Sequence, residues 1–100
     1  MEHDTIAGIL GAIGQPKRLE ILKLVAPFSR GSSPTGLTAG EIARGTGLPP
    51  ATLSFHLKDM TYRGLLRPER KGRSIIYRAD IGVLATALEY VVTEICGITD

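Results

Sequence analysis

Residues 38–64 constrain the fold of this chain more than any other stretch. Thr38 and Glu41 have the three-residue spacing of a capping box, which satisfies backbone N–H groups at the start of a helix. Gly45 or Gly47 is suited to end that helix a few residues later. We therefore predict a short helix followed by a tight turn.

A second helix is predicted directly after this turn. Pro49 and Pro50 suit a helix start, where a missing N–H costs nothing, and Gly64 suits the position after the end. Its apolar side chains recur at spacings of four and three and so form one stripe: Leu53, Leu57 and Met60. Two helices joined by a glycine-containing turn form a helix-turn-helix, which we assign to residues 38–64.

The opposite face of the second helix is small, polar and aromatic, with almost no acid. A surface helix normally carries mixed charges there. In the major groove of DNA, hydroxyl groups read base edges and apolar groups contact thymine methyls. We therefore predict that this face contacts DNA through Ala51, Thr52, Ser54, Phe55 and Lys58. His56 lies beside the apolar stripe, and it has two interpretations, a hydrogen-bonded packing residue or a DNA contact.

A basic β-hairpin is predicted downstream, at residues 65–79. Two strand-like segments flank Lys71, Gly72 and Arg73, and we predict phosphate contacts from Arg70, Lys71 and Arg73. A helix-turn-helix followed by such a hairpin is a winged helix. The predicted fold class is thus mainly α with a small β-hairpin.

Positive charge is concentrated in the same region. Residues 44–78 contain eight basic and two acidic residues, a net charge of +6, whereas the rest of the chain carries −4. A local basic patch is the electrostatic footprint of nucleic-acid binding. The alternative is a basic face that is merely solvated, but the coincidence of the positive charge with the predicted winged helix favours DNA binding.

Two apolar helices flank this unit, at residues 4–14 and 80–96. Their apolar faces are wider than one small domain needs, which predicts a two-fold-symmetric homodimer. The predicted interface consists of Ile6, Ile9, Leu10, Ile13, Leu84, Leu88, Val91 and Ile95. The alternative is that both helices complete the core of a single chain.

The segment between the first helix and the helix-turn-helix contains one more predicted helix and a loop. The helix runs from Pro16 to about Ala26, with Leu19 among its apolar residues and Arg18 among its polar ones. Residues 28–36 are rich in Gly, Ser and Pro, which predicts a loop. That loop is either a plain connector or an anion-binding segment.

Several functional classes have no support in the sequence. With 100 residues we expect a single domain, residues 1–100. One cysteine permits no intramolecular disulfide and fits a reducing compartment. Neither a signal peptide nor a membrane-spanning run of about 18 apolar residues is seen. We therefore expect a cytoplasmic protein without a membrane partner. No catalytic constellation or phosphate-binding loop appears, so no enzyme activity and no cofactor are predicted.

Several motifs resemble the ArsR/SmtB family of bacterial repressors, in the right order along nearly the whole chain. They are residues 14–22, 54–60, 64–66 and 70–77. The resemblance implies a homodimeric winged helix that binds an operator and is released or altered by a metal, metalloid or oxidant. It also implies dimerisation through the first and last helices, in agreement with the two apolar stripes.

The sensor motifs of that family are mostly absent. One subgroup of the family carries a Cys-x-Cys pair at the positions of residues 38–40, which here are Thr-Ala-Gly. Another subgroup carries His and carboxylate ligands in the last helix, and here Thr93 and Cys96 stand at the later of those positions. No metal site is predicted, because divalent metals need several such ligands. Some relatives end the last helix with two adjacent cysteines, whereas here Cys96 follows Ile95. Cys96 is a candidate thiol sensor or a small packing residue, and the effector stays open.

Together these features predict a sequence-specific transcriptional repressor that binds a palindromic double-stranded operator as a homodimer. The alternative is a winged-helix protein-interaction module without specific DNA binding. Such a module has no need of the +6 charge at residues 44–78.

Overall fold

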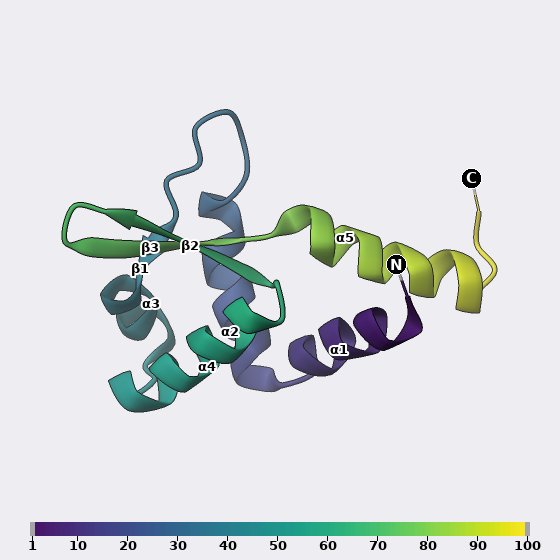
Figure 1. Cartoon of the computed structure of the whole chain (residues 1–100), viewed down its shortest axis with the longest axis horizontal. Coiled ribbons are helices and arrows are strands. Elements are labelled where there is room, and N and C mark those ends of the chain that lie inside the picture. The colour runs from purple at the N-terminus through teal and green to yellow at the C-terminus, as the bar shows by residue number, and fades with distance from the viewer. Residues whose placement is uncertain (1, 100) are drawn as a thin grey trace.

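The computed structural model describes residues 2–99 and shows a winged helix-turn-helix (Figure 1). The predicted fold class, mainly α with a small β-hairpin, is therefore confirmed. The elements in chain order are α1 (His3–Ile13), α2 (Pro16–Val25), the 3₁₀-helix η1 (Ala26–Phe28), β1 (Leu37–Thr38), α3 (Ala39–Thr46), α4 (Pro50–Tyr62), β2 (Leu66–Lys71), β3 (Ser74–Ala79), α5 (Ile81–Tyr90) and the π-helix η2 (Val91–Ile95).

The molecule is elongated, and its two ends are formed by different elements. Helices α1 and α5 lie side by side at one end, and the β2–β3 hairpin projects at the other end, next to α3 (Figure 1). Helix α2 lies between them. Among the described residues, no helix combines the length and the apolar character that crossing a membrane requires.

The helix-turn-helix begins with the predicted capping box. The Thr38 hydroxyl accepts a hydrogen bond from the Glu41 N–H at 3.2 Å, and the Glu41 carboxylate accepts one from the Thr38 N–H at 2.9 Å. The hydrogen bond from the Thr38 N–H to the carboxylate holds the pKa of Glu41 below its ordinary value. Helix α3 ends at Gly47, whose φ of 72° is left-handed and costs glycine little.

The wing is formed by β2 and β3, with Leu66 opposite Ala79 at its base. At its tip, Gly72 has a φ of 62° and takes the first of two loop positions between the paired Lys71 and Ser74. A type II′ hairpin turn requires a positive φ at that position. The third strand, β1, pairs with β3 on its other edge, giving the order β1-β3-β2. It was not predicted, because two residues show no alternation.

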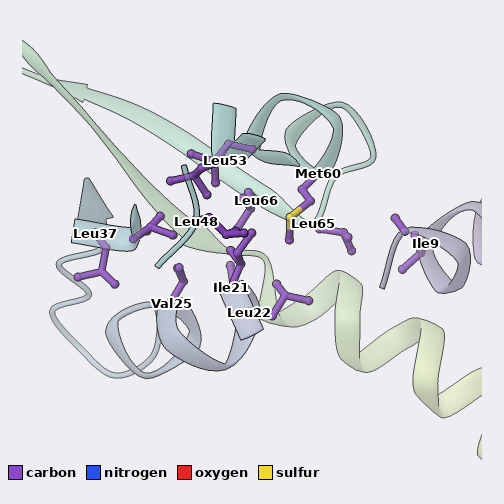
Figure 2. Close-up of a cluster of buried hydrophobic side chains, with 14 of the residues drawn as sticks. Ile9, Ile21, Leu22, Val25, Leu37, Leu48, Leu53, Met60, Leu65 and Leu66 are labelled. Atoms are coloured by element: carbon purple, nitrogen blue, oxygen red, sulfur yellow. The ribbon is translucent and has the colours of Figure 1, made fainter. Parts of the chain in front are cut away.

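A single apolar core holds these elements together. The predicted inner stripe of α4 is buried in it, with Leu53, Leu57 and Met60 each at most 3% exposed. Figure 2 shows Met60 beside Leu65, and Leu66 over Ile21 of α2. Because the inner stripe is fixed in the core, the opposite face of α4 must point to solvent.

In helix α2 the burial of two adjacent residues does not follow their polarity. Arg18 is 3% exposed, whereas Leu19 is 52% exposed. The physical reason is that Arg18 has charged and polar partners on α4, which compensate the cost of burying its guanidinium. Leu19 consequently lies on the outside of the same helix.

The final helix is not the uniform α-helix expected for residues 80–96. It continues from α5 into the π-helix η2, in which the Cys96 N–H donates to the Val91 carbonyl five residues earlier. The wider turn changes which apolar side chains share a face. The exposed apolar stripe consists of Leu88, Val92 and Ile95.

The loop predicted at residues 28–36 begins one residue later, because Phe28 ends the 3₁₀-helix η1, and both ends of the loop are anchored. The Ser29 hydroxyl donates to the Val25 carbonyl at 2.9 Å and accepts from the Ala79 N–H at 2.8 Å. Near the other end, Arg78 donates to the Pro34 carbonyl at 3.1 Å. These bonds join the loop to β3, so it supports the base of the wing.

Candidate nucleic-acid interface

Helix α4 presents a continuous outward face. All five residues predicted to contact DNA on this helix are exposed: Ala51, Thr52, Ser54, Phe55 and Lys58. Phe55 is 66% exposed although it is apolar, and Tyr62 at the end of the helix is 86% exposed. The face therefore combines small groups, hydroxyls, one cation and exposed aromatic rings. Such a face can form both polar and apolar contacts with base edges.

The basic residues of the wing fall into two groups. Arg67 donates to Asp80 and Arg78 to Glu69, both at 2.8 Å, so these two arginines are occupied within the chain. The hydrogen bond from Arg78 holds the pKa of Glu69 below its ordinary value. By contrast, within residues 2–99 the exposed side chains nearest the hairpin tip form no ion pair: Arg70, Lys71 and Arg73.

No acid forms an ion pair with these tip residues in the described part of the chain, although Lys71 lies close enough to Glu69 to contribute to the lowering of the Glu69 pKa. Lys58 on α4 and Arg44 on α3 are exposed and likewise outside the ion pairs of residues 2–99. A cation without an internal partner keeps its full charge for an external anion. These five cations lie on α3, on α4 and at the wing tip; two further cations outside the ion pairs of residues 2–99, Lys23 and Arg30, lie on α2 and in the loop after η1.

Two adjoining hollows connect α4 with the wing. One has a volume of about 190 Å³ and reaches Ser54, and the other reaches Arg73 at the wing tip. Both are lined by Ala39, Gly40 and Tyr77. Because Ala39 and Gly40 have almost no side chain, a bulky partner can approach the surface between α4 and the wing closely.

Sequence reasoning missed the part that Arg18 has at this site. Its Nε donates to His56 Nδ1 at 3.1 Å, and its Nη1 donates to Asp59 Oδ2 at 2.6 Å. His56 therefore has a partner inside the chain, which favours the packing interpretation over a DNA contact. No signal in the periodicity of α2 distinguishes Arg18 from an ordinary surface arginine.

The residues predicted to form a dimer interface differ widely in exposure. Ile6 and Ile9 are each 4% exposed and so are already covered by the chain itself. Four others are half-buried: Leu10, Ile13, Leu84 and Val91. Leu88 and Ile95 are 52% and 70% exposed, so the surface still available for a partner is concentrated on α5 and η2.

Cys96 is exposed and follows the last residue of η2. Within the part of the chain that the structure describes, no three His, Cys, Asp or Glu side chains come together as a metal site. The first turn of α3 places Thr38, Ala39 and Gly40 beside the wing, where they line the hollow that reaches Arg73.

Comparison with known proteins decides the family. Residues 13–69, more than half of the chain, match the family model described as a helix-turn-helix domain. The chain belongs to the helix-turn-helix domain family. This helix-turn-helix protein is also 38% identical over 71 residues to the HTH-type transcriptional regulator YgaV of Escherichia coli K12. The match covers 71% of this chain and 66% of that relative, just under two thirds of its length.

Solved structures agree on the fold of this helix-turn-helix protein. An ArsR-like transcriptional regulator from Rhodococcus sp. RHA1 superposes with a TM-score of 0.77 at 22% identity, covering 95% of this chain and 81% of that one. A homodimeric winged helix-turn-helix domain from Mycobacterium bovis, described as a possible ArsR-family regulator, has a TM-score of 0.69 at 24% identity, covering 94% and 79%. The chain therefore shares the winged-helix fold of ArsR-like regulators, as the sequence resemblance predicted. The relatives are transcriptional regulators, not enzymes.

Proposed function

We propose that this protein is a transcriptional repressor that binds a palindromic DNA operator as a homodimer. The observation that carries the proposal is the outward face of α4, which is free of acidic side chains from Ala51 to Lys58 and is held in place by a buried inner stripe. In a helix-turn-helix the second helix enters the major groove. Here that helix is α4.

Each part of the surface receives a separate role. Thr52, Ser54 and Phe55 contact base edges and thymine methyls, with Ala51 small enough to permit close approach. Lys58 and the wing-tip cations neutralise phosphates: Arg70, Lys71 and Arg73. Phosphate contacts position the protein on DNA, whereas base contacts select the sequence.

The homodimer is supported by the exposed apolar stripe of α5 and η2, in which Leu88, Val92 and Ile95 are 42–70% exposed. A similar fold forms a homodimer in the Mycobacterium bovis structure. Two-fold symmetry would place the two α4 helices on successive major-groove faces, about 34–36 Å apart. The operator is accordingly a pseudo-palindrome.

Repression follows from occupancy, because a dimer covering a promoter blocks access to it. As a DNA-bound regulator the protein acts in the cytoplasm. We propose no metal effector. Cys96 is exposed to solvent and is the candidate thiol sensor.

The test is selection of duplexes from a randomised library by the purified protein, followed by titration of the enriched duplex and a scrambled control. We expect enrichment of a sequence with two-fold symmetry and binding that weakens steeply with salt. Enrichment of a single, asymmetric half-site would contradict the proposal that the protein binds a palindromic operator as a dimer. Absence of any DNA binding at low salt would favour the protein-interaction module instead.

A further inference from the structure

Arg18 is buried although it carries a permanent positive charge. Its side chain is 4% exposed, and the Asp59 side chain that it contacts is 29% exposed. Burying an unpaired guanidinium would be costly, so this arginine is stable there only because its partners are in place. Both partners, His56 and Asp59, belong to α4, the helix that we propose reads DNA.

The geometry joins two helices at two points. The two hydrogen bonds, 3.1 Å to His56 and 2.6 Å to Asp59, come from one planar guanidinium and end three residues apart on α4. The buried stripe of α4 determines which face points outward, and two bonds from one rigid group add resistance to the smaller rolling and sliding movements that a packed helix can still make. The arginine is itself held by α2, whose Ile21 and Val25 are fully buried in the core.

The residues held by Arg18 alternate with those that face outward. Phe55 directly precedes His56 and Lys58 directly precedes Asp59. A helix with side chains has a radius of about 5–6 Å, so a roll of about 20° would move side-chain ends by about 2 Å. Hydrogen bonds to base edges tolerate only about 0.5 Å of change in length. Loss of the Arg18 contacts would thus misplace the reading face without unfolding the helix.

We propose, on the basis of the proposed DNA-binding function, that Arg18 is a positioning residue for sequence recognition. It contacts no DNA, and it fixes the rotation of α4 through His56 and Asp59. The same geometry assigns the histidine tautomer. Arginine Nε is always a donor, so His56 Nδ1 accepts and the ring proton lies on Nε2.

The experiment compares two affinities for each variant, one for the duplex enriched by the wild-type protein and one for its scrambled control. Arg18→Met removes both hydrogen bonds and retains an apolar stem of similar length. We expect it to weaken binding to the enriched duplex about tenfold, the effect of roughly one mismatched base pair, with scrambled DNA bound within about twofold of wild type. The ratio of the two affinities therefore falls.

Arg63→Met is the matched control, because Arg63 also faces Asp59, at 3.7 Å, but its side chain is 45% exposed. It should leave the affinity ratio unchanged. Asp59→Asn keeps the shape of the side chain and removes one charged partner, so it should lower the ratio by a smaller factor. It also provides the test should Arg18→Met fail to fold.

If Arg18 had a purely structural role, Arg18→Met would lower the melting temperature and the active fraction, and it would leave the affinity ratio of the folded protein unchanged.

The NMR chemical shifts of the His56 ring nitrogens give an independent readout. They should show an unprotonated Nδ1 in the wild type and a change in Arg18→Met. Unchanged ratios in Arg18→Met and Asp59→Asn, with the wild type still selective, would overturn the positioning role alone. A wild type that enriches no sequence would overturn the proposed function, and the positioning role with it.

Discussion

At the scale of single residues, Asp80 links the wing to the last helix. Its carboxylate accepts the Val83 N–H at 3.0 Å, as the N-cap of α5, and accepts from Arg67 Nε of β2 at 2.8 Å. The hydrogen bond from the Val83 N–H, and then that from Arg67, hold the pKa of Asp80 below its ordinary value of 3.8. A lowered folded-state pKa means that the ionised carboxylate stabilises the fold.

Asp80→Ala should therefore destabilise the protein by about 1 kcal/mol at neutral pH, the usual cost of losing a helix N-cap. The stabilisation is fully present above the unfolded-state pKa of about 4 and is lost as the pH falls through the lower folded-state value. Urea unfolding of wild type and variant at fixed protein concentration, from pH 7 to pH 3, should show the two stabilities converging. Asp80→Asn retains a capping oxygen but removes the charge. If the difference in unfolding free energy between wild type and either variant stayed constant with pH, the role of the charge would be contradicted.

Arg18 and Leu19 mark the limit of sequence reasoning at this scale. Apolar periodicity predicts which face of a helix is buried on average, and it placed the inner stripe of α4 correctly. It cannot identify a polar residue whose partners lie about forty positions away, as His56 and Asp59 do. The burial of Arg18 was therefore not predicted.

At the scale of elements, those with strong local signals were predictable. The capping box of α3, the prolines at the start of α4 and the glycine in the wing turn each determine the backbone nearby. The third strand β1 was not predictable, because two residues form a strand only through pairing with β3. The π-helix η2 was not predictable either, because its wider turn has no signal in the apolar periodicity. The outward residues of α4 could be named from sequence, and their roles toward DNA remain predictions.

For the wing, we predict that Arg73→Ala weakens binding to every duplex alike. One lost phosphate contact should reduce the slope of log affinity against log salt concentration by about 0.9. Titrations at several salt concentrations with enriched and scrambled duplexes measure both quantities. Arg67→Ala is the control on the same hairpin, because its guanidinium is paired with Asp80. An unchanged slope for Arg73→Ala would remove the wing tip from the interface.

At the scale of the whole molecule, the proposed reading parts and the proposed dimer surface occupy opposite ends (Figure 1). The wing lies at one end, with α4 packed against β2, while α1, α5 and η2 lie at the other. An exposed stripe containing Leu88 and Ile95 is costly in water, and a second copy of the chain would cover it. Mutations of the reading parts are therefore expected to leave dimerisation intact.

Leu88→Glu should convert the dimer to a monomer, since an unpaired charge would be buried in the interface. Thr86→Glu adds the same charge two residues earlier, on a different side of α5, and should leave the dimer intact. Analytical ultracentrifugation at micromolar concentration distinguishes the two species. A monomeric wild type, or a dimeric Leu88→Glu, would show that this stripe is not the interface.

The exposed stripe of α5 and η2 also bears on gene dosage. When two chains must associate before they fit an operator, occupancy below the dimer dissociation constant rises with the square of the chain concentration. Halving the chain concentration, as dilution by one doubling of cell volume does without new synthesis, then reduces occupancy about fourfold at low saturation. The side chains of Leu88, Val92 and Ile95 would thus set a threshold of expression below which the controlled promoter opens abruptly.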